Sequence, residues 1–200
     1  LWYESFQLPD NHRKIRVLKR SNVKYWVTEA YDQFPSAQNP RGVKRVIEFK
    51  DVLPRAFLVG RSRVVPESEL LNTYYSEEFD PFKEVLLKEP VAIKNTINFS
   101  GQVESVNYHP NRVSLKTSQN GEGFLVLLDS WFPGWKAKVD GNPEQIYRAN
   151  HFYRGIKLGP GSHRIEFSYE PVGLTLGAAV SGVTFILLLF LCFKPQRAIQ

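Results

Sequence analysis

The stretch from Gly123 to Pro171 constrains the fold more than any other part of the chain. Its first apolar run, Phe124 to Leu128, is short and uninterrupted, which predicts a buried strand. Apolar and polar residues then alternate with the period of half-buried strands at 135–139 and 165–169. Gly, Pro and Asn residues fill the intervening turns at 140–143 and 159–162. Short strands separated by such turns predict an antiparallel β-sandwich.

The residues before this stretch extend the same mainly β pattern. We expect a hairpin around 109–111, a short helix whose first turn holds Pro66, and further strands at 23–28, 43–49 and 56–59; residues 85–87 form a short apolar run. Residues 32–41 are rich in Pro and small polar residues and predict a loop. The sequence therefore predicts a sandwich domain over 21–171 with one or two short helices. Residues 1–20 are expected to form a connector or short helix that leaves an upstream membrane region.

After Pro171 the composition changes abruptly. The segment 172–193 carries no charge and consists mostly of Leu, Val, Ala, Gly and Phe. About 20 such residues span a bilayer as a helix, so the sequence predicts a C-terminal transmembrane helix in contact with membrane lipids. Lys194 and Arg197 follow the run, and by the positive-inside rule the tail 194–200 is expected in the cytoplasm. The domain 21–171 is then extracytoplasmic, at the outer face of the cell membrane.

Small residues recur at four-residue spacing inside the predicted membrane helix. Gly173 with Gly177, and Ala178 with Gly182, form small-xxx-small pairs that allow another helix to approach closely. The expected partners are upstream transmembrane helices of the same parent chain. The alternative is that Gly and Ala are simply common in membrane helices, and the sequence does not separate the two interpretations.

Composition limits the partners and the classes of function. The formal net charge is +6, which suits a soluble basic surface or, alternatively, attraction to anionic lipids and cell-wall polymers. The Lys and Arg residues are scattered and form no recognition motif, so no nucleic-acid partner is predicted. The single cysteine, Cys192, excludes internal disulfides. The chain contains no Met, and we expect it to be a piece of a longer protein.

No catalytic constellation is recognisable in the sequence. The four histidines do not pair at metal-ligand spacing, so no metal site is predicted. Ser130 lacks the flanking glycines of a nucleophile elbow. The glycines fall in hairpin turns rather than in a phosphate-binding loop, and no cofactor is predicted. Asp129 is interpreted as a residue that caps the end of a strand.

Aromatic residues with nearby Arg and Asn are the best candidates for binding. Flat aromatic faces suit the apolar C–H faces of sugar rings, and Arg suits phosphate. The predicted ligand-binding residues are Trp131, Phe132, Arg148, Asn150, Tyr153 and Arg154. Three alternatives stay open: some of these aromatics belong to the core, Trp131 and Phe132 enter the membrane interface, or the arginines only tie loops to backbone carbonyls. Trp135, in phase with Ala137 and Val139, is predicted to be buried.

An ordered set of short motifs carries a resemblance to a known family. The set runs Asp129, Pro133-Gly134-Trp135, Val139-Asp140-Gly141, Tyr147-Arg148-Ala149-Asn150, Arg154-Gly155, Gly161-Ser162-His163 and Phe167-Ser168-Tyr169-Glu170-Pro171. Motifs earlier in the chain that fit the same resemblance include Asn22-Val23-Lys24-Tyr25 and Leu53-Pro54-Arg55-Ala56-Phe57-Leu58-Val59. The chain resembles the C-terminal extracytoplasmic domain and last membrane helix of YfhO-like bacterial membrane proteins.

The resemblance implies a function in the cell envelope. YfhO-like proteins resemble C-type-fold membrane glycosyltransferases, which use a polyprenyl-phosphate sugar and decorate lipoteichoic acid or related surface glycans. Their catalytic acidic residues are expected upstream, so none is carried over here. The first hypothesis is an accessory domain that positions the acceptor glycan. The alternatives are a non-catalytic structural or glycan-binding module, and a surface protein with a single tail anchor.

Overall fold

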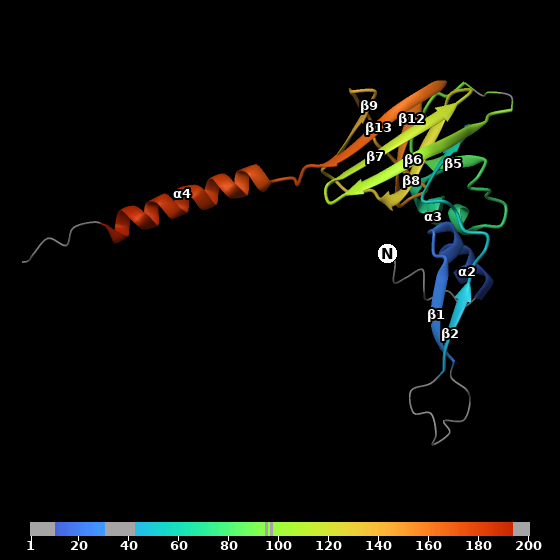
Figure 1. Ribbon diagram of the computed structural model, residues 1–200, viewed down its shortest axis with the longest axis horizontal. Coiled ribbons are helices and arrows are strands. Elements are labelled where there is room, and N and C mark those ends of the chain that lie inside the picture. The colour runs from blue at the N-terminus through green and yellow to red at the C-terminus, as the bar shows by residue number, and fades with distance from the viewer. Residues whose placement is uncertain (1–10, 31–42, 95, 97, 194–200) are drawn as a thin grey trace, which may run out of the picture.

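The computed structural model describes residues 11–30, 43–94, 96 and 98–193. Its centre is a four-stranded antiparallel sheet in the order β11-β12-β8-β3 (Figure 1). The strands are β3 (Ala56–Val59), β8 (Gly123–Ser130), β11 (Tyr147–Ala149) and β12 (Tyr153–Leu158). This sheet is the middle layer of three.

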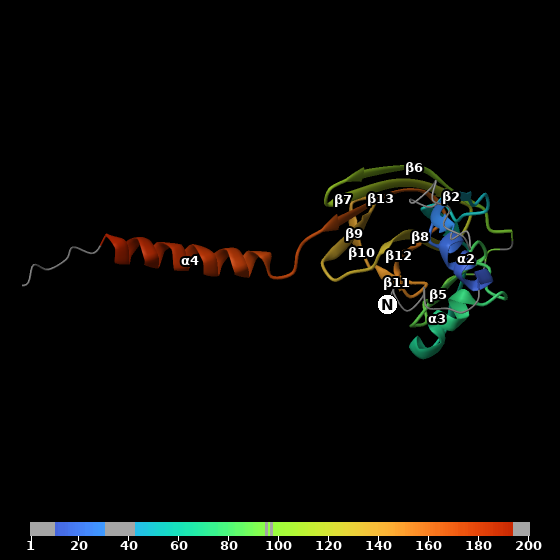
Figure 2. The same cartoon turned by 90° about the horizontal axis from the view of Figure 1, so that it is seen from below.

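A five-stranded antiparallel sheet covers one face of the middle sheet, as Figure 2 shows. Its order is β10-β9-β13-β7-β6. The strands are β6 (Gly101–His109), β7 (Arg112–Gln119), β9 (Trp135–Val139), β10 (Asn142–Glu144) and β13 (Gly161–Tyr169). The core between the two sheets includes Leu115, Ile156 and Phe167, each at most 1% exposed. The predicted antiparallel sandwich is confirmed.

Helices and a small sheet cover the other face of the middle sheet. They are α2 (Asn11–Arg20), α3 (Glu67–Tyr75) and the parallel pair of β4 (Arg61–Val64) with β5 (Glu84–Leu87). A second core fills this space and includes Tyr74, Phe79 and Leu86. The helix beginning after Pro66 was predicted, and Glu67 and Glu69 in its first turn suit the positive end of its dipole. The parallel pairing of β4 and β5 was not predicted.

Strand β8 contributes to both cores. Phe124 and Val126 face the layer of helices, whereas Leu125 and Leu127 face the five-stranded sheet, and all four are 0% exposed. A strand buried on both faces reads as a continuous apolar run rather than an alternation. The prediction of a buried strand at this run is confirmed.

Within the predicted connector or short helix at 1–20, the described residues 11–20 form helix α2, which packs on the folded domain. Within α2, Val17 and Leu18 are only 3% and 5% exposed, respectively. The hairpin of β1 (Tyr25–Ala30) and β2 (Val43–Glu48) follows and confirms two predicted strands. The predicted loop at 32–41 and the tail 194–200 lie outside the described residues.

Helix α4 (Leu174–Cys192) begins after Gly173, whose φ of +86° is a conformation that glycine adopts without strain. It extends away from the sandwich, and its side chains from Leu174 to Phe190 are exposed (Figure 1). Within the described residues, no helix combines the length and the apolarity that a membrane crossing requires. The transmembrane prediction for 172–193 is thus not confirmed. No atom lies close to a Cβ built at Gly177 or Gly182, and their role in helix packing stays a prediction.

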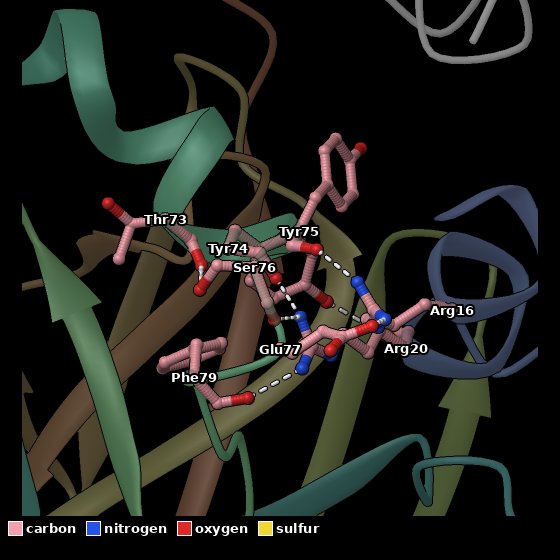
Figure 3. A network of polar contacts seen from close by, with 8 residues as sticks. All are labelled: Arg16, Arg20, Thr73, Tyr74, Tyr75, Ser76, Glu77 and Phe79. Atoms are coloured by element: carbon pink, nitrogen blue, oxygen red, sulfur yellow. Dashed lines mark hydrogen bonds and ion pairs between the residues drawn. The ribbon is translucent and has the colours of Figure 1, made fainter. Parts of the chain in front are cut away.

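Arg20 joins α2 to the end of α3. Its guanidinium donates hydrogen bonds to the carbonyls of Tyr74, Ser76 (3.2 Å) and Phe79 (2.5 Å), as Figure 3 shows. The Tyr74 hydroxyl donates in return to the Arg20 carbonyl at 3.0 Å. The last carbonyls of a helix lack partners within the helix, so one planar cation satisfies groups that would otherwise be buried without a hydrogen bond.

Replacing Arg20 by Lys should destabilise the fold by about 3 kcal/mol, because a compact ammonium cannot serve three carbonyls at once. Urea unfolding of the purified chain in detergent would measure the loss. Arg61→Lys, at an exposed position of β4, is the matched control and should change the free energy of unfolding by less than about 0.5 kcal/mol. Equal stability of the two variants would contradict this account of Arg20.

Candidate functional site

The loop between β8 and β9 presents two exposed aromatic side chains at one end of the sandwich. Trp131 is 37% exposed and Phe132 is 59% exposed. The Trp131 amide donates to the Phe152 carbonyl at 2.7 Å, which fixes the start of the loop. Gly134 ends it with a φ of +102°, and a Cβ there would lie 2.6 Å from the Glu170 carbonyl oxygen. The loop therefore has a defined shape.

A hollow of about 240 Å³ lies beside Trp131, and we call it the Trp131 pocket. It is formed by the end of β5, the Trp131 side chain, β11 and the residues just before β11. Its lining residues are Leu87, Lys88, Glu89, Trp131, Gln145, Ile146, Tyr147 and Arg148. Two aromatic rings, two cations, one carboxylate and one amide thus converge on a space the size of a small ring.

Arg148 is held in place at this pocket. Its guanidinium carbon lies 5.9 Å from the centroid of the Trp131 ring, a cation–π distance. Its Nε donates to the His151 carbonyl at 2.5 Å and its Nη1 to Glu67 at 3.1 Å. The side chain keeps 35% of its surface exposed. Arg148 is therefore held by Glu67 and the His151 carbonyl, while part of its guanidinium faces solvent.

Glu67, at the start of α3, holds both cations of the pocket. Its second carboxylate oxygen lies 3.3 Å from the Lys88 ammonium. The hydrogen bond and the charge of Lys88 lower the pKa of Glu67, and the charges of Arg148 and His151 lower it further. The carboxylate therefore stays ionised at neutral pH and keeps Lys88 and Arg148 together.

These groups can bind a ligand that is both cyclic and charged. An indole face stacks on the apolar face of a sugar ring, and the Gln145 amide and Tyr147 hydroxyl offer polar contacts to hydroxyl groups. Arg148 and Lys88 suit phosphate or carboxylate oxygens. No group of His, Cys, Asp or Glu side chains in the described part of the chain could hold a metal ion.

The structure buries Asn150, Tyr153 and Arg154, which were predicted to contact a ligand. The backbone amide of Asn150 donates to the Leu86 carbonyl at 2.9 Å. The side-chain oxygen of Asn150 accepts from the backbone amide of Leu86 at 2.8 Å. The Tyr153 hydroxyl donates to Ser21 at 3.0 Å, which links β12 to the end of α2. These contacts give both residues structural roles in joining the layers.

Arg154 lies between the two large sheets and is 2% exposed. It pairs with Asp129 at 2.7 Å, and its guanidinium carbon lies 3.8 Å from the Trp135 ring centroid and 4.9 Å from that of Phe167. Burial lowers the pKa of Arg154, and the charge of Asp129 opposes that shift. Asp129 also pairs with Arg55 at 2.9 Å, so it bridges two arginines rather than merely ending a strand.

The structure brings only some of the predicted binding residues together. Trp131 and Arg148 line the Trp131 pocket. Phe132 does not, and instead lines a second surface hollow that it shares with Trp131. Trp135, predicted to be buried, is half-buried beneath Arg154. Glu67 and Lys88 were missed because they come from elements about 60 to 80 residues earlier in the chain, and no local motif marks them.

Comparison with known proteins bears out the family resemblance. A family model described as "Bacterial membrane protein YfhO" matches residues 92–181. The "Uncharacterized protein YfhO" of Bacillus subtilis (strain 168) is 24% identical over 123 residues, which is 61% of this chain and 13% of that relative. No solved structure matches. The chain is thus similar to YfhO-like bacterial membrane proteins over part of its length, and it spans only about an eighth of this relative.

The Asn150 turn should be sensitive to both its side chain and its backbone. Asn150 adopts a φ of +49°, and its side chain satisfies the buried Leu86 amide. We expect Asn150→Gly to cost about 1–3 kcal/mol through the lost hydrogen bond. Asn150→Ala should cost about 1 kcal/mol more, because alanine is also strained at positive φ. Thermal or urea unfolding would rank the variants, and equal losses would show that backbone strain does not matter here.

His151 should make stability depend on pH. Burial, and then the charge of Arg148, lower its pKa below the ordinary 6.5, with Glu67 opposing. The unfolded chain therefore binds the proton first as the pH falls through 6.5, and the free energy of unfolding should fall by at most about 1.4 kcal/mol per pH unit. Carboxylates titrate below this range.

Urea unfolding at about pH 7.5 and about pH 5.5 would measure this effect. His151→Asn, which tolerates the left-handed backbone at φ +71°, should reduce the difference between the two pH values. His109→Asn, at an exposed turn, should leave the difference intact. An unchanged pH dependence in His151→Asn would contradict the assignment.

Proposed function

We propose that this chain is an extracytoplasmic accessory domain of a multispanning, glycosyltransferase-like membrane protein, and that its Trp131 pocket positions the acceptor. The acceptor class is a cell-surface glycan or an anionic polymer of polyol-phosphate units, such as lipoteichoic acid. The observation that carries the proposal is the convergence of Trp131, Tyr147, Lys88 and Arg148 on one small hollow. The YfhO-like sequence supports the membrane setting.

The chemistry of the pocket fits an acceptor that is both cyclic and charged. The exposed Trp131 indole offers a face to a sugar ring, whose axial hydrogens form an apolar surface. The solvent-facing part of the Arg148 guanidinium can donate to a phosphate oxygen, and Lys88 adds a point charge. Because Glu67 already orients both cations, little side-chain freedom is lost when the ligand binds.

Helix α4 places the domain relative to the membrane in this proposal. Its 19 residues carry no charge and extend for about 28 Å. We place the uncharged segment 172–193 among membrane lipids and the other helices of the parent protein, with Gly173, Gly177 and Gly182 at close helix contacts. Lys194 and Arg197 then lie on the cytoplasmic side and the sandwich outside.

A second candidate function is a structural module that binds no glycan. The contacts of Arg148 favour it, because Glu67 and the His151 carbonyl already accept hydrogen bonds from its guanidinium. In that case the Trp131–Arg148 contact serves only to hold the loop against β11.

Ligand titration separates the two candidates. We expect a glycerol-phosphate oligomer to quench or shift Trp fluorescence of the purified chain, with binding weakened by salt because the ligand is anionic. Trp131→Ala should raise the dissociation constant about tenfold, which corresponds to roughly 1.4 kcal/mol. Phe132→Ala is the matched control, since its exposed ring does not line the pocket. A folded chain that shows no change at millimolar oligomer or neutral oligosaccharide is a structural module.

A further inference from the structure

We propose that the end of the sandwich from which α4 leaves is a membrane-contacting surface, whose exposed aromatic side chains enter the lipid head-group region. The inference rests on the membrane placement of 172–193 in the proposed function and adds a lipid-binding surface outside the Trp131 pocket. We call this surface the α4-proximal face. Its residues are Tyr108, Asn111, Phe132, Pro133, Lys136 and Val172.

Three separate segments bring apolar groups to this face. The turn between β6 and β7 follows Tyr108, which is 41% exposed. The loop between β8 and β9 presents Phe132, 59% exposed, and the linker to α4 presents Val172, 80% exposed. Aromatic side chains at the level of the head groups are a general feature of membrane proteins. Apolar side chains left exposed to water forgo the free energy that burial of their surface would contribute.

Backbone hydrogen bonds tie these segments to the base of α4. The Glu170 amide donates to the Gly134 carbonyl at 2.8 Å, and the Tyr169 amide donates to the Asn111 carbonyl at 2.9 Å. Only three residues, 171–173, separate this anchored strand end from the first residue of α4. Fully extended, the four Cα–Cα steps from Glu170 to Leu174 reach at most about 14 Å. The aromatic loop is therefore tethered close to the point where α4 begins.

The charges of this end favour a bilayer interface over a purely anionic partner. Arg55 pairs with Asp129 at 2.9 Å, Arg112 with Glu166 at 3.4 Å, and Lys136 with Glu170 at 2.5 Å. Arg55 shares Asp129 with the buried Arg154, whereas Arg112 and Lys136 each have their own acidic partner, so these pairs leave one positive charge uncompensated. Attraction to it should come from the aromatic groups, so zwitterionic lipid should suffice and anionic lipid should add little.

The test measures the depth of single fluorescent probes in the full chain, reconstituted in phosphatidylcholine vesicles. Cys192→Ser removes the one native thiol, and an environment-sensitive dye is attached through Phe132→Cys. The matched control is Ser162→Cys, exposed at the opposite end of β13 and about 23 Å from Tyr169 along the strand. Val180→Cys, in α4, reports whether the helix itself has entered the bilayer. Circular dichroism checks that each variant is folded.

We expect lipids spin-labelled near the head group to quench the dye at position 132 but not at 162, and deeply labelled lipids to quench it at 180. Replacing part of the lipid with phosphatidylglycerol should leave the quenching at 132 unchanged. Quenching at 180 without quenching at 132 overturns the membrane-contacting surface while the proposed membrane placement stands. Absence of quenching at both 132 and 180 overturns the placement and the surface together. Glycan titration of the Trp131 pocket is independent of either result.

Discussion

The burial of the middle sheet on both faces is the constraint on which the rest of the structure depends. Strand β8 has no solvent-facing side along its centre, since Phe124 to Leu127 are all 0% exposed. Each face needs a cover, so the five-stranded sheet supplies one and α2, α3 and the β4–β5 pair supply the other. The Trp131 loop begins directly after β8, which gives its exposed rings a rigid base.

Polar side chains join the layers where hydrophobic packing alone would leave backbone or charged groups unsatisfied. Arg20 connects α2 to the end of α3, Asn150 connects the β11–β12 turn to β5, and Arg154 connects the two large sheets through Asp129. Removing one member of such a contact leaves its partner buried without compensation, which costs more than the contact itself contributes. These residues fix the alignment of the layers beneath the candidate site.

The sequence predicted those features that depend on local patterns. The apolar run of β8, the alternation in β9 and β13 and the turn glycines identified the sandwich, because each signal lies within a few residues. The parallel pairing of β4 with β5 and the α2–α3 contact depend on residues far apart in the chain, so no local period encodes them. For the same reason the sequence pointed to Trp131 and Arg148 but not to Glu67 and Lys88, which lie far away in the chain. Asn150 and Arg154 are buried, and their residue types serve binding and burial equally well, so sequence alone does not separate the two roles.

The hydrogen bond between Tyr153 and Ser21 has a consequence for how the chain assembles. It joins residues 132 positions apart. Arg20, next to Ser21 in the chain, donates to carbonyls that lie 54 to 59 positions further along. Closing loops of this length costs entropy before the contact returns any stabilisation, which slows folding. During synthesis the α2 segment meets α3 first and β12 only later. The contact between the layer of helices and β12 can therefore form only after most of the chain has been made.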